Sequence, residues 1–481
     1  MQTLLQLPEH VLFKFVALKC VYLLNIIRHL PPELHPIAVE AKHPELNEKK
    51  LFLRYSYRGQ AERYLTELVH MLETISLRFT GMLVLELDTG IVFSPEQLDS
   101  EVLSRKLSDT LQSLTHLVRL QITGGLNSIV AAGLAEALPL MSALQSFAVL
   151  DMQDLLPATG CGCFNNVLRS LTSLHSLRSL KVCGFRDIST TAISGFCSAL
   201  SQLHSLTALC LRSCFHWSRN GEVHRWACGL HVPGEVGAAM VTLTGLKSLQ
   251  LIECFSMDFV EPILAAIGHL KGLTHLNLSR LSHMPPVMVP HRVHVPDLTA
   301  LPDKEESENT DNSASPINFL EDLNFQKGLS PMLGRLPDLQ SLSLSGAWMW
   351  GGDQALASSL AGLSKLTQLN LTGFYRPCFF WEAFGEHVTA LQRLKSVAVQ
   401  DNALMPHEGQ SLLRGLAALP QLLCLKGDVE PLGNLHADLE RMAALSRLEL
   451  FVGDCDQGAA LQLDLSKSLG NLGEKVQVVV I

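Results

Sequence analysis

The chain has 481 residues, of which 47% are hydrophobic and 17% are charged, and its formal net charge is -9. An acidic chain without a long basic run is poorly suited to nucleic acid or anionic lipid, which by elimination favours protein partners. Its twelve cysteines are scattered rather than set at disulfide-framework spacings. That distribution predicts a reducing, intracellular compartment, the cytoplasm with the nucleus as an alternative.

Residues 1–80 show no repeated pattern and are expected to form a helical N-terminal cap. Pro8 suits the first turn of a helix, and the polar residues after it gather on one side of a helical wheel. A second helix is predicted at 59–75. Solenoid proteins need such a cap to shield their first repeat. Attachment to a membrane surface is an alternative, but Lys14 and Lys19 interrupt the best apolar run, so no membrane span is expected.

The motif Leu7-Pro8-Glu9, followed by Val11-Leu12, resembles the opening of an F-box. F-boxes are helical modules that dock onto a ubiquitin-ligase scaffold. The later residues of that module, a Val-Cys/Ser-Lys-x-Trp-like stretch in particular, are absent. The resemblance implies a ubiquitin-ligase scaffold as the partner of residues 1–40, and it stays an alternative to the cap.

From residue 81 to 481 the pattern L-x-x-L-x-x-L-x-L recurs, most completely at Leu363–Leu371, with copies usually 27 or 28 residues apart. Self-similarity at such a period predicts a solenoid. Two insertions interrupt the period, at about 213–232 and 282–318. The second holds six prolines and an acidic, polar run, a composition that predicts a disordered loop, either tolerated or binding a partner. The closing segment, 475–481, is expected to be a strand.

Each repeat combines two periodicities. The tail Leu366-x-x-Leu369-x-Leu371 alternates as a short strand does, and Leu356, Leu360 and Leu363 form one apolar helical stripe. One strand and one helix do not bury their own apolar faces, so the copies must stack on a shared core. The sequence therefore predicts an α/β solenoid with a curved parallel sheet inside and helices outside.

The pattern resembles the leucine-rich repeat family, in particular its ribonuclease-inhibitor-like subtype, over residues 80–481. The resemblance implies a recognition surface and a non-enzymatic protein-interaction scaffold. The family carries Asn or Cys three residues after the last strand leucine, where the side chain satisfies loop backbone groups. Here only Cys214, Cys254 and Asn402 follow that rule.

The sequence lacks nucleotide-binding, metalloprotease and nucleophile-elbow motifs, so neither catalytic residues nor cofactors are expected. One set of side chains in the shorter insertion has ligands that suit zinc. It consists of Cys214, His216, His224, Cys228 and His231. Because paired C-x-x-C knuckles are absent and Cys214 already fills the loop position, no metal site is predicted.

Two surfaces are candidates for partner binding. The residues between the strand leucines should face the concave side, and they are small, polar and mostly uncharged, as Gln368 and Asn370 illustrate. The aromatic residues instead gather between strands and helices, along one edge. They are Trp217, Trp226, Trp348, Trp350, Phe374, Tyr375, Phe380 and Trp381. We expect this edge to supply hot-spot contacts; the alternative is that these rings cover loops and helix starts.

The leading interpretation is therefore an interaction scaffold. A ubiquitin-ligase substrate receptor is the main alternative. A GTPase-activating protein is a further one, for which only Arg119 on an early strand offers itself. An innate-immunity sensor is the last, although the chain shows no nucleotide-binding motif for a switch.

Overall fold

A computed structural model describes sixteen stretches of the chain. They are residues 38–39, 50–54, 84–88, 100–123, 128–150, 161–184, 190–214, 231–254, 260–280, 323–347, 353–374, 380–402, 404–428, 441–442, 444–451 and 477–480. These residues form one sheet of fifteen strands, in which spatial order follows chain order.

The strands have three to five residues, except for the first, which has two. They are β1 Ala38–Val39, β2 Lys50–Arg54, β3 Val84–Asp88, β4 Arg119–Thr123, β5 Ser146–Leu150, β6 Ser179–Cys183, β7 Ala208–Arg212, β8 Ser248–Ile252, β9 His275–Asn277, β10 Ser341–Ser343, β11 Gln368–Asn370, β12 Ser396–Ala398, β13 Cys424–Asp428, β14 Arg447–Phe451 and β15 Gln477–Val480.

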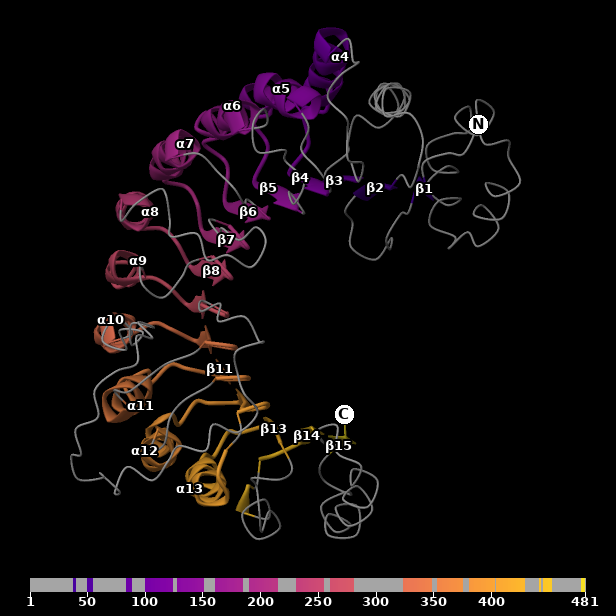
Figure 1. Ribbon diagram of the computed structural model, residues 1–481. Coiled ribbons are helices and arrows are strands. Elements are labelled where there is room, and N and C mark those ends of the chain that lie inside the picture. Colours follow the sequence, from indigo (N-terminus) through magenta and orange to yellow (C-terminus); the bar gives the residue numbers. More distant parts are fainter. Residues whose placement is uncertain are drawn as a thin grey trace, which may run out of the picture.

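Helices alternate with these strands. They are α4 Ser100–Ser113, α5 Ser128–Ala137, α6 Cys161–Leu171, α7 Thr190–Gln202, α8 His231–Val241, α9 Glu261–Ile267, α10 Leu323–Leu333, α11 Asp353–Ala361, α12 Phe380–His387 and α13 Pro406–Ala417, with short 3-10 helices at Leu138–Leu140 and Val388–Ala390. The elements lie along an arc, with the strands on its inner side and the helices on its outer side (Figure 1).

Every neighbouring pair of strands from β2 to β15 is parallel, whereas β1 pairs with β2 in the antiparallel sense. A helix between consecutive parallel strands is the crossover that such pairing requires. The helices are wider than the strand spacing, so the sheet curves with its bare face inward. The predicted α/β solenoid, with a curved parallel sheet inside and helices outside, is therefore confirmed.

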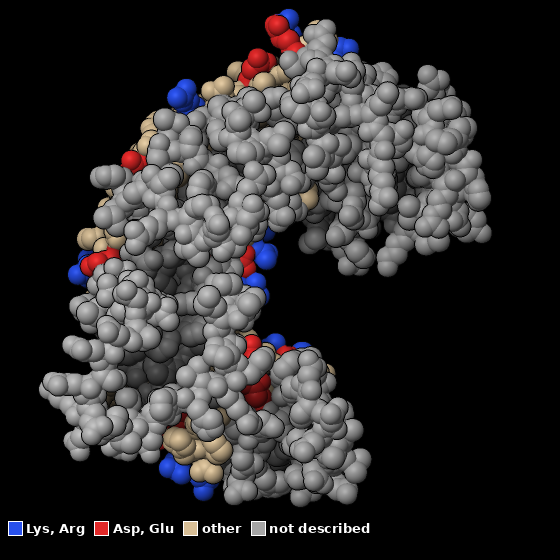
Figure 2. Space-filling view, viewed as in Figure 1, with Lys and Arg blue, Asp and Glu red and all other residues tan. Residues whose placement is uncertain are grey.

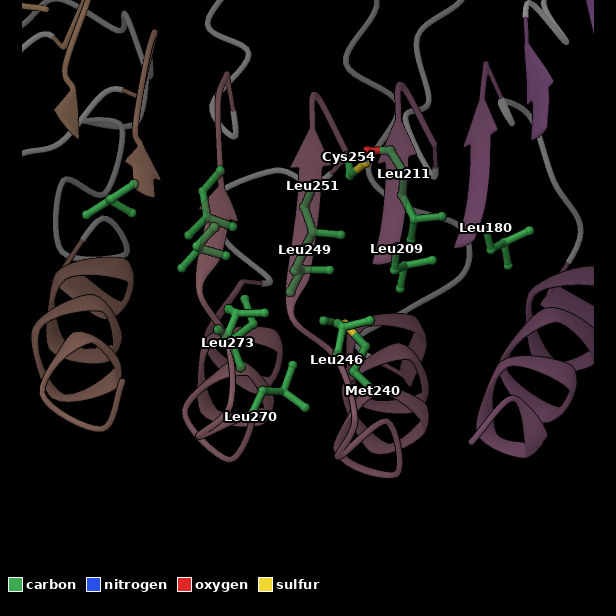
Figure 3. Packing of buried hydrophobic residues seen from close by; sticks show 14 of the residues in the cluster. Leu180, Leu209, Leu211, Met240, Leu246, Leu249, Leu251, Cys254, Leu270 and Leu273 are labelled. Atoms are coloured by element: carbon green, nitrogen blue, oxygen red, sulfur yellow. Dashed lines mark hydrogen bonds between the residues drawn. The ribbon is translucent and has the colours of Figure 1, made fainter. Parts of the chain in front are cut away.

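The strand leucines form one continuous core between the sheet and the helices. Leu249 of β8 aligns with Leu209 of β7 and Leu276 of β9, and all three are at most 2% exposed. Figure 3 shows the same stacking for the labelled leucines of β7 and β8. Each fully buried leucine contributes about 1.5–3 kcal/mol of hydrophobic free energy, so the fold depends on the sum over copies.

The L-x-x-L part of the motif is a turn that leads into the strand. The amide of Leu246 donates to the carbonyl of Leu243 at 3.0 Å, and that of Leu273 donates to Leu270 at 2.9 Å. Just before three strands a threonine hydroxyl donates to a carbonyl of the preceding repeat, for example Thr274 Oγ1 to Lys247 O at 2.9 Å. These bonds fix each turn against the previous one.

Near the N-terminus the sheet begins earlier than the sequence indicates, because β1 and β2 lie within residues 1–80. Leu51 and Leu53 of β2 align with Leu85 and Leu87 of β3. The pattern missed this strand since Glu45 and Glu48 stand where the first two leucines of a copy belong. The helix expected to begin near Pro8 and the one expected at 59–75 lie outside the described residues. The second insertion and most of the first do so too.

Candidate interaction surface

The inner face of the arc presents the residues that lie between the strand leucines. At one register, Gln250, Asn277, Ser343 and Asn370 stand side by side on β8 to β11. We call the polar residues of this region the polar wall. It comprises Ser248, Gln250, His275, Asn277, Ser279, Ser341, Ser343, Ser345, Gln368, Asn370 and Thr372.

Hydrogen bonds within the polar wall orient its amides. The Oδ1 atom of Asn277 accepts from the backbone amide of Ser279 at 3.0 Å, and Asn370 Oδ1 accepts in the same way from Thr372. The hydroxyls of Ser279 and Ser343 lie 3.0 Å apart. Because the amide oxygens are engaged by their own strands, the Nδ2 groups are the donors that Asn277 and Asn370 can offer to a partner.

Residues with left-handed backbone conformation follow the ends of successive strands and form a row along this edge of the sheet, which we call the rim. Glu253, Arg280 and Asp401 have φ between 53° and 56°, and the equivalent positions of two other repeats are Gly346 and Gly373. Left-handed backbone costs energy for residues other than glycine. The left-handed conformation recurs at one register because backbone hydrogen bonds between neighbouring repeats impose it. Arg280 N, for example, donates to Ser345 O at 2.7 Å.

Side chains link three residues of this rim. Ser213 Oγ donates to Glu253 Oε2 at 2.7 Å, and Arg280 Nη1 donates to Glu253 Oε1 at 2.8 Å. The sequence analysis did not single out these residues. These residues share one position relative to the strand leucines of successive copies. That shared position is recognisable only when the insertion between β7 and β8 is left out of the residue spacing.

The three residues that match the family's loop position each bond to a backbone group of the preceding repeat, in a strand for the two cysteines and in a loop for the asparagine. Cys214 Sγ donates to Val182 O at 3.3 Å, and Cys254 Sγ donates to Leu211 O at 3.1 Å (Figure 3). Asn402 Oδ1 accepts from the backbone amide of Phe374 at 2.6 Å. Cys214 is fully buried, so it belongs to the loop core.

The other members of the histidine–cysteine set are not placed. His216, His224 and Cys228 lie outside the described residues, and His231 is described only as the first residue of α8. Among the residues that the structure describes, no group of three or more potential metal ligands occurs.

The aromatic residues that the structure describes do not form a surface, which corrects the prediction for three of them. Phe374 and Phe380 are 0% exposed and Trp381 is 2% exposed. Their ring centroids lie 5.0 to 6.3 Å apart. Phe374 occupies the buried loop position that Cys214 holds elsewhere, and Phe380 and Trp381 open α12 with their rings toward the core.

The remaining candidates divide into two groups. Gln368 is exposed and Asn370 half-buried, both on the polar wall. The other aromatic candidates lie outside the described residues, so their role in binding stays a prediction. They are Trp217, Trp226, Trp348, Trp350 and Tyr375.

Charged side chains flank the polar wall on the inner edge of the arc (Figure 2). Toward the C-terminus, Glu449 of β14 accepts from Lys426 Nζ and from Arg447 Nε, both at 2.6 Å. The Glu449 side chain is only 6% exposed. The hydrogen bond from Lys426, followed by that from Arg447, holds the pKa of Glu449 below its ordinary value.

We expect Glu449→Gln to lower the free energy of unfolding at neutral pH by about 1–2 kcal/mol, because a neutral amide replaces the carboxylate that accepts charge-assisted hydrogen bonds from Lys426 and Arg447. A carboxyl whose pKa is lower in the folded state stabilises above its unfolded pKa and stops doing so as pH falls through the folded-state pKa. The difference in free energy of unfolding between the two proteins should therefore be smaller at about pH 3, which is below the pKa of glutamate in the unfolded chain. Urea titrations of both proteins at the two pH values measure this, and an equal deficit at both would contradict it.

No family model matches the chain, and no curated protein matches it. Among solved structures, a chain of the yeast Rad7–Elc1 complex aligns with a TM-score of 0.40 and 12% identity, over 81% of this chain and 84% of that one. An alignment of that quality supports no statement about what this chain binds. Within the described residues, no helix is long and apolar enough to cross a membrane.

Proposed function

We propose that the protein is a non-enzymatic interaction scaffold that binds an extended segment of another protein along the polar wall. The observation that carries this proposal is the unbroken row of Gln250, Asn277, Ser343 and Asn370 on four neighbouring strands. Amides and hydroxyls repeated at one register offer hydrogen bonds at the spacing of parallel strands, about 4.8 Å.

The chemistry of the wall fits a polar, extended partner. Its side chains are short, so a bound segment can approach the sheet closely and make many contacts. Since the described part of the wall lacks the tryptophan, tyrosine and arginine anchors that dominate tight interfaces, we expect moderate affinity. We also expect weak dependence on salt, because the wall itself is largely uncharged.

The proposal includes a reducing, intracellular location and the absence of a cofactor. Six cysteines among the described residues are free thiols, which suits such a compartment. The ribonuclease-inhibitor-like subtype remains part of the proposal, which is supported by one α-helix between each pair of neighbouring strands from β3 to β13. The ubiquitin-ligase alternative depends on residues 1–40, of which only Ala38 and Val39 lie within the described residues.

Two serine-to-arginine variants test the proposal. Ser343→Arg places a long cation in the middle of the wall, whereas Ser358→Arg makes the same change on the exposed side of α11. Affinity purification followed by mass spectrometry should lose its specific partners with Ser343→Arg and keep them with Ser358→Arg. We expect about a tenfold or greater loss of binding, equivalent to about 1.4 kcal/mol.

The reverse pattern would place the binding surface on the helices and overturn the proposal. Partner binding retained by both variants, with both folded by circular dichroism, would exclude the polar wall. Binding that is lost only on deletion of residues 1–40, together with a ubiquitin-ligase scaffold, would favour the substrate-receptor alternative.

A further inference from the structure

Two cysteines and two basic residues meet on the inner face, next to the polar wall. Cys183 ends β6, and Cys210 lies in the middle of β7. The strand register sets Lys181 opposite Cys210 and Cys183 opposite Arg212. Thiols and cations therefore alternate on two adjacent strands, with Cys210 half-buried and both basic side chains exposed.

The two thiols are unequal. Cys183 is 8% exposed, and its thiol donates a hydrogen bond to Cys210. That bond, and then Lys181 and Arg212, lower the pKa of Cys210 against the opposing effect of burial. The same bond and burial raise the pKa of Cys183. Of the two thiols, Cys210 is therefore the one that ionises more readily.

The other groups that face Cys210 do not cancel this asymmetry. On β8 the residue opposite is the uncharged Gln250. The thiol of Cys214, in the loop core below, raises the pKa of Cys210, but by less than Lys181 lowers it. Among the described residues, no carboxylate forms an ion pair with Lys181 or Arg212. Their charge is therefore available both to the thiolate and to an anionic ligand.

We propose that Cys210 is a modification site that undergoes thiol–disulfide exchange with a small anionic disulfide. The Cys210 thiolate attacks one sulfur of the disulfide, a new sulfur–sulfur bond forms, and the old one breaks. The second sulfur leaves as a thiolate with the electron pair and takes a proton from water. Lys181 and Arg212 bind the carboxylates of the reagent.

The mixed disulfide should persist rather than be resolved by Cys183. The two cysteines are diagonal neighbours, since each faces a basic residue two positions away from the other cysteine. Diagonal positions on neighbouring strands are about 7–8 Å apart, whereas a disulfide needs Cα atoms within about 4.4–6.8 Å. An internal Cys183–Cys210 bond therefore requires movement of the strands.

The chain supplies a matched control in Cys424. This thiol is also half-buried, on β13 of the same face. It faces Arg447 and lies two residues before Lys426, so it has the same kind of basic neighbours. Both of these neighbours, however, are bound by Glu449 at 2.6 Å. Cys424 thus tests whether unneutralised cations and a second thiol are what activate Cys210.

The experiment treats the full-length folded protein with oxidised glutathione, an anionic probe, or with cystamine, a cationic one. Peptide mass spectrometry then follows the modification of each cysteine over time. With oxidised glutathione, Cys210 should react about tenfold or more faster than Cys424, as expected for a more ionised thiol. Cystamine should remove most of this advantage, because Lys181 and Arg212 repel it.

Two variants separate the causes. Lys181→Met with Arg212→Met should slow Cys210 severalfold toward oxidised glutathione and abolish the preference over cystamine, leaving Cys424 unchanged. Cys183→Ala should slow Cys210 toward both reagents. Equal rates at Cys210 and Cys424 in the unmodified sequence would overturn the proposal without any variant. An internal Cys183–Cys210 disulfide as the main product would overturn the assignment of a persistent mixed disulfide.

Discussion

Replacing Trp381 with alanine should lower the free energy of unfolding by about 3–5 kcal/mol, the range for removing a buried aromatic side chain. Trp381 is 2% exposed and packs edge-on against Phe374, Phe380 and Phe384, with centroids 5.0 to 6.3 Å away. Nothing of this size is available to refill the space between α12 and the sheet. Urea denaturation followed by far-ultraviolet circular dichroism measures the effect without relying on tryptophan fluorescence.

The control is Gln368→Ala on the exposed inner face, which should change stability by less than about 0.5 kcal/mol. Comparison of the Trp381→Ala and Gln368→Ala variants distinguishes a role of the aromatic residues in the core from a role in partner binding. A core role predicts that Trp381→Ala affects stability first and binding only through it. Lost partner binding with unchanged stability would instead return Trp381 to the interaction surface.

Gly415→Ala should destabilise the protein by about 1–3 kcal/mol, the cost of forcing extra volume into a packed interface. A Cβ atom at position 415 of α13 would overlap the carbonyl oxygen of Gly385 and come within 2.6 Å of the Val388 side chain. A Cβ atom at position 385 of α12 would meet backbone atoms of Ser411 at 2.6 Å. The two helices contact each other through backbone atoms at these glycines. An added Cβ atom therefore requires one of the helices to move.

A second glycine gives the opposite expectation. At Gly234 in α8 an added Cβ atom meets nothing within 4 Å. Gly234→Ala should therefore stabilise the protein by about 0.5–1 kcal/mol, since alanine favours helix and restricts the unfolded chain. Thermal unfolding of both variants measures the two signs. Stabilisation by Gly415→Ala would contradict the close backbone contact between α12 and α13.

The solenoid was predictable because its core is a sum of identical contacts. Leu246, Leu249 and Leu251 are each 0% exposed, and the same spacing occurs in every complete copy. A pattern repeated that often reports both element types and their stacking. Strand β2 was missed where only Leu51 and Leu53 of a copy remain.

The aromatic residues were not predictable in the same way. A ring just before a helix can cover a loop, enter the core or face solvent, and the local sequence is alike in all three cases. Phe374 is buried because its register places it where Cys214 lies in another repeat. Trp381 is buried because the first turn of α12 faces the sheet.

Contacts between distant copies were also beyond sequence reasoning. Glu253 meets Ser213 across 40 residues and Arg280 across 27, and Cys210 meets Cys183 across an interval of 27 residues in the chain. Such pairs follow from the strand register. The register can be derived only once the residues of each insertion are known to belong to a loop, because the strands on either side of it can then be aligned.

The most direct test of the interaction surface is the dissociation constant of a purified partner for the unmodified protein, for Ser343→Arg and for Ser358→Arg. Binding through the polar wall predicts that Ser343→Arg weakens the complex about tenfold or more, a change of about 1.4 kcal/mol, while Ser358→Arg leaves it unchanged. Equal affinities for all three proteins, or weakening by Ser358→Arg alone, would contradict it.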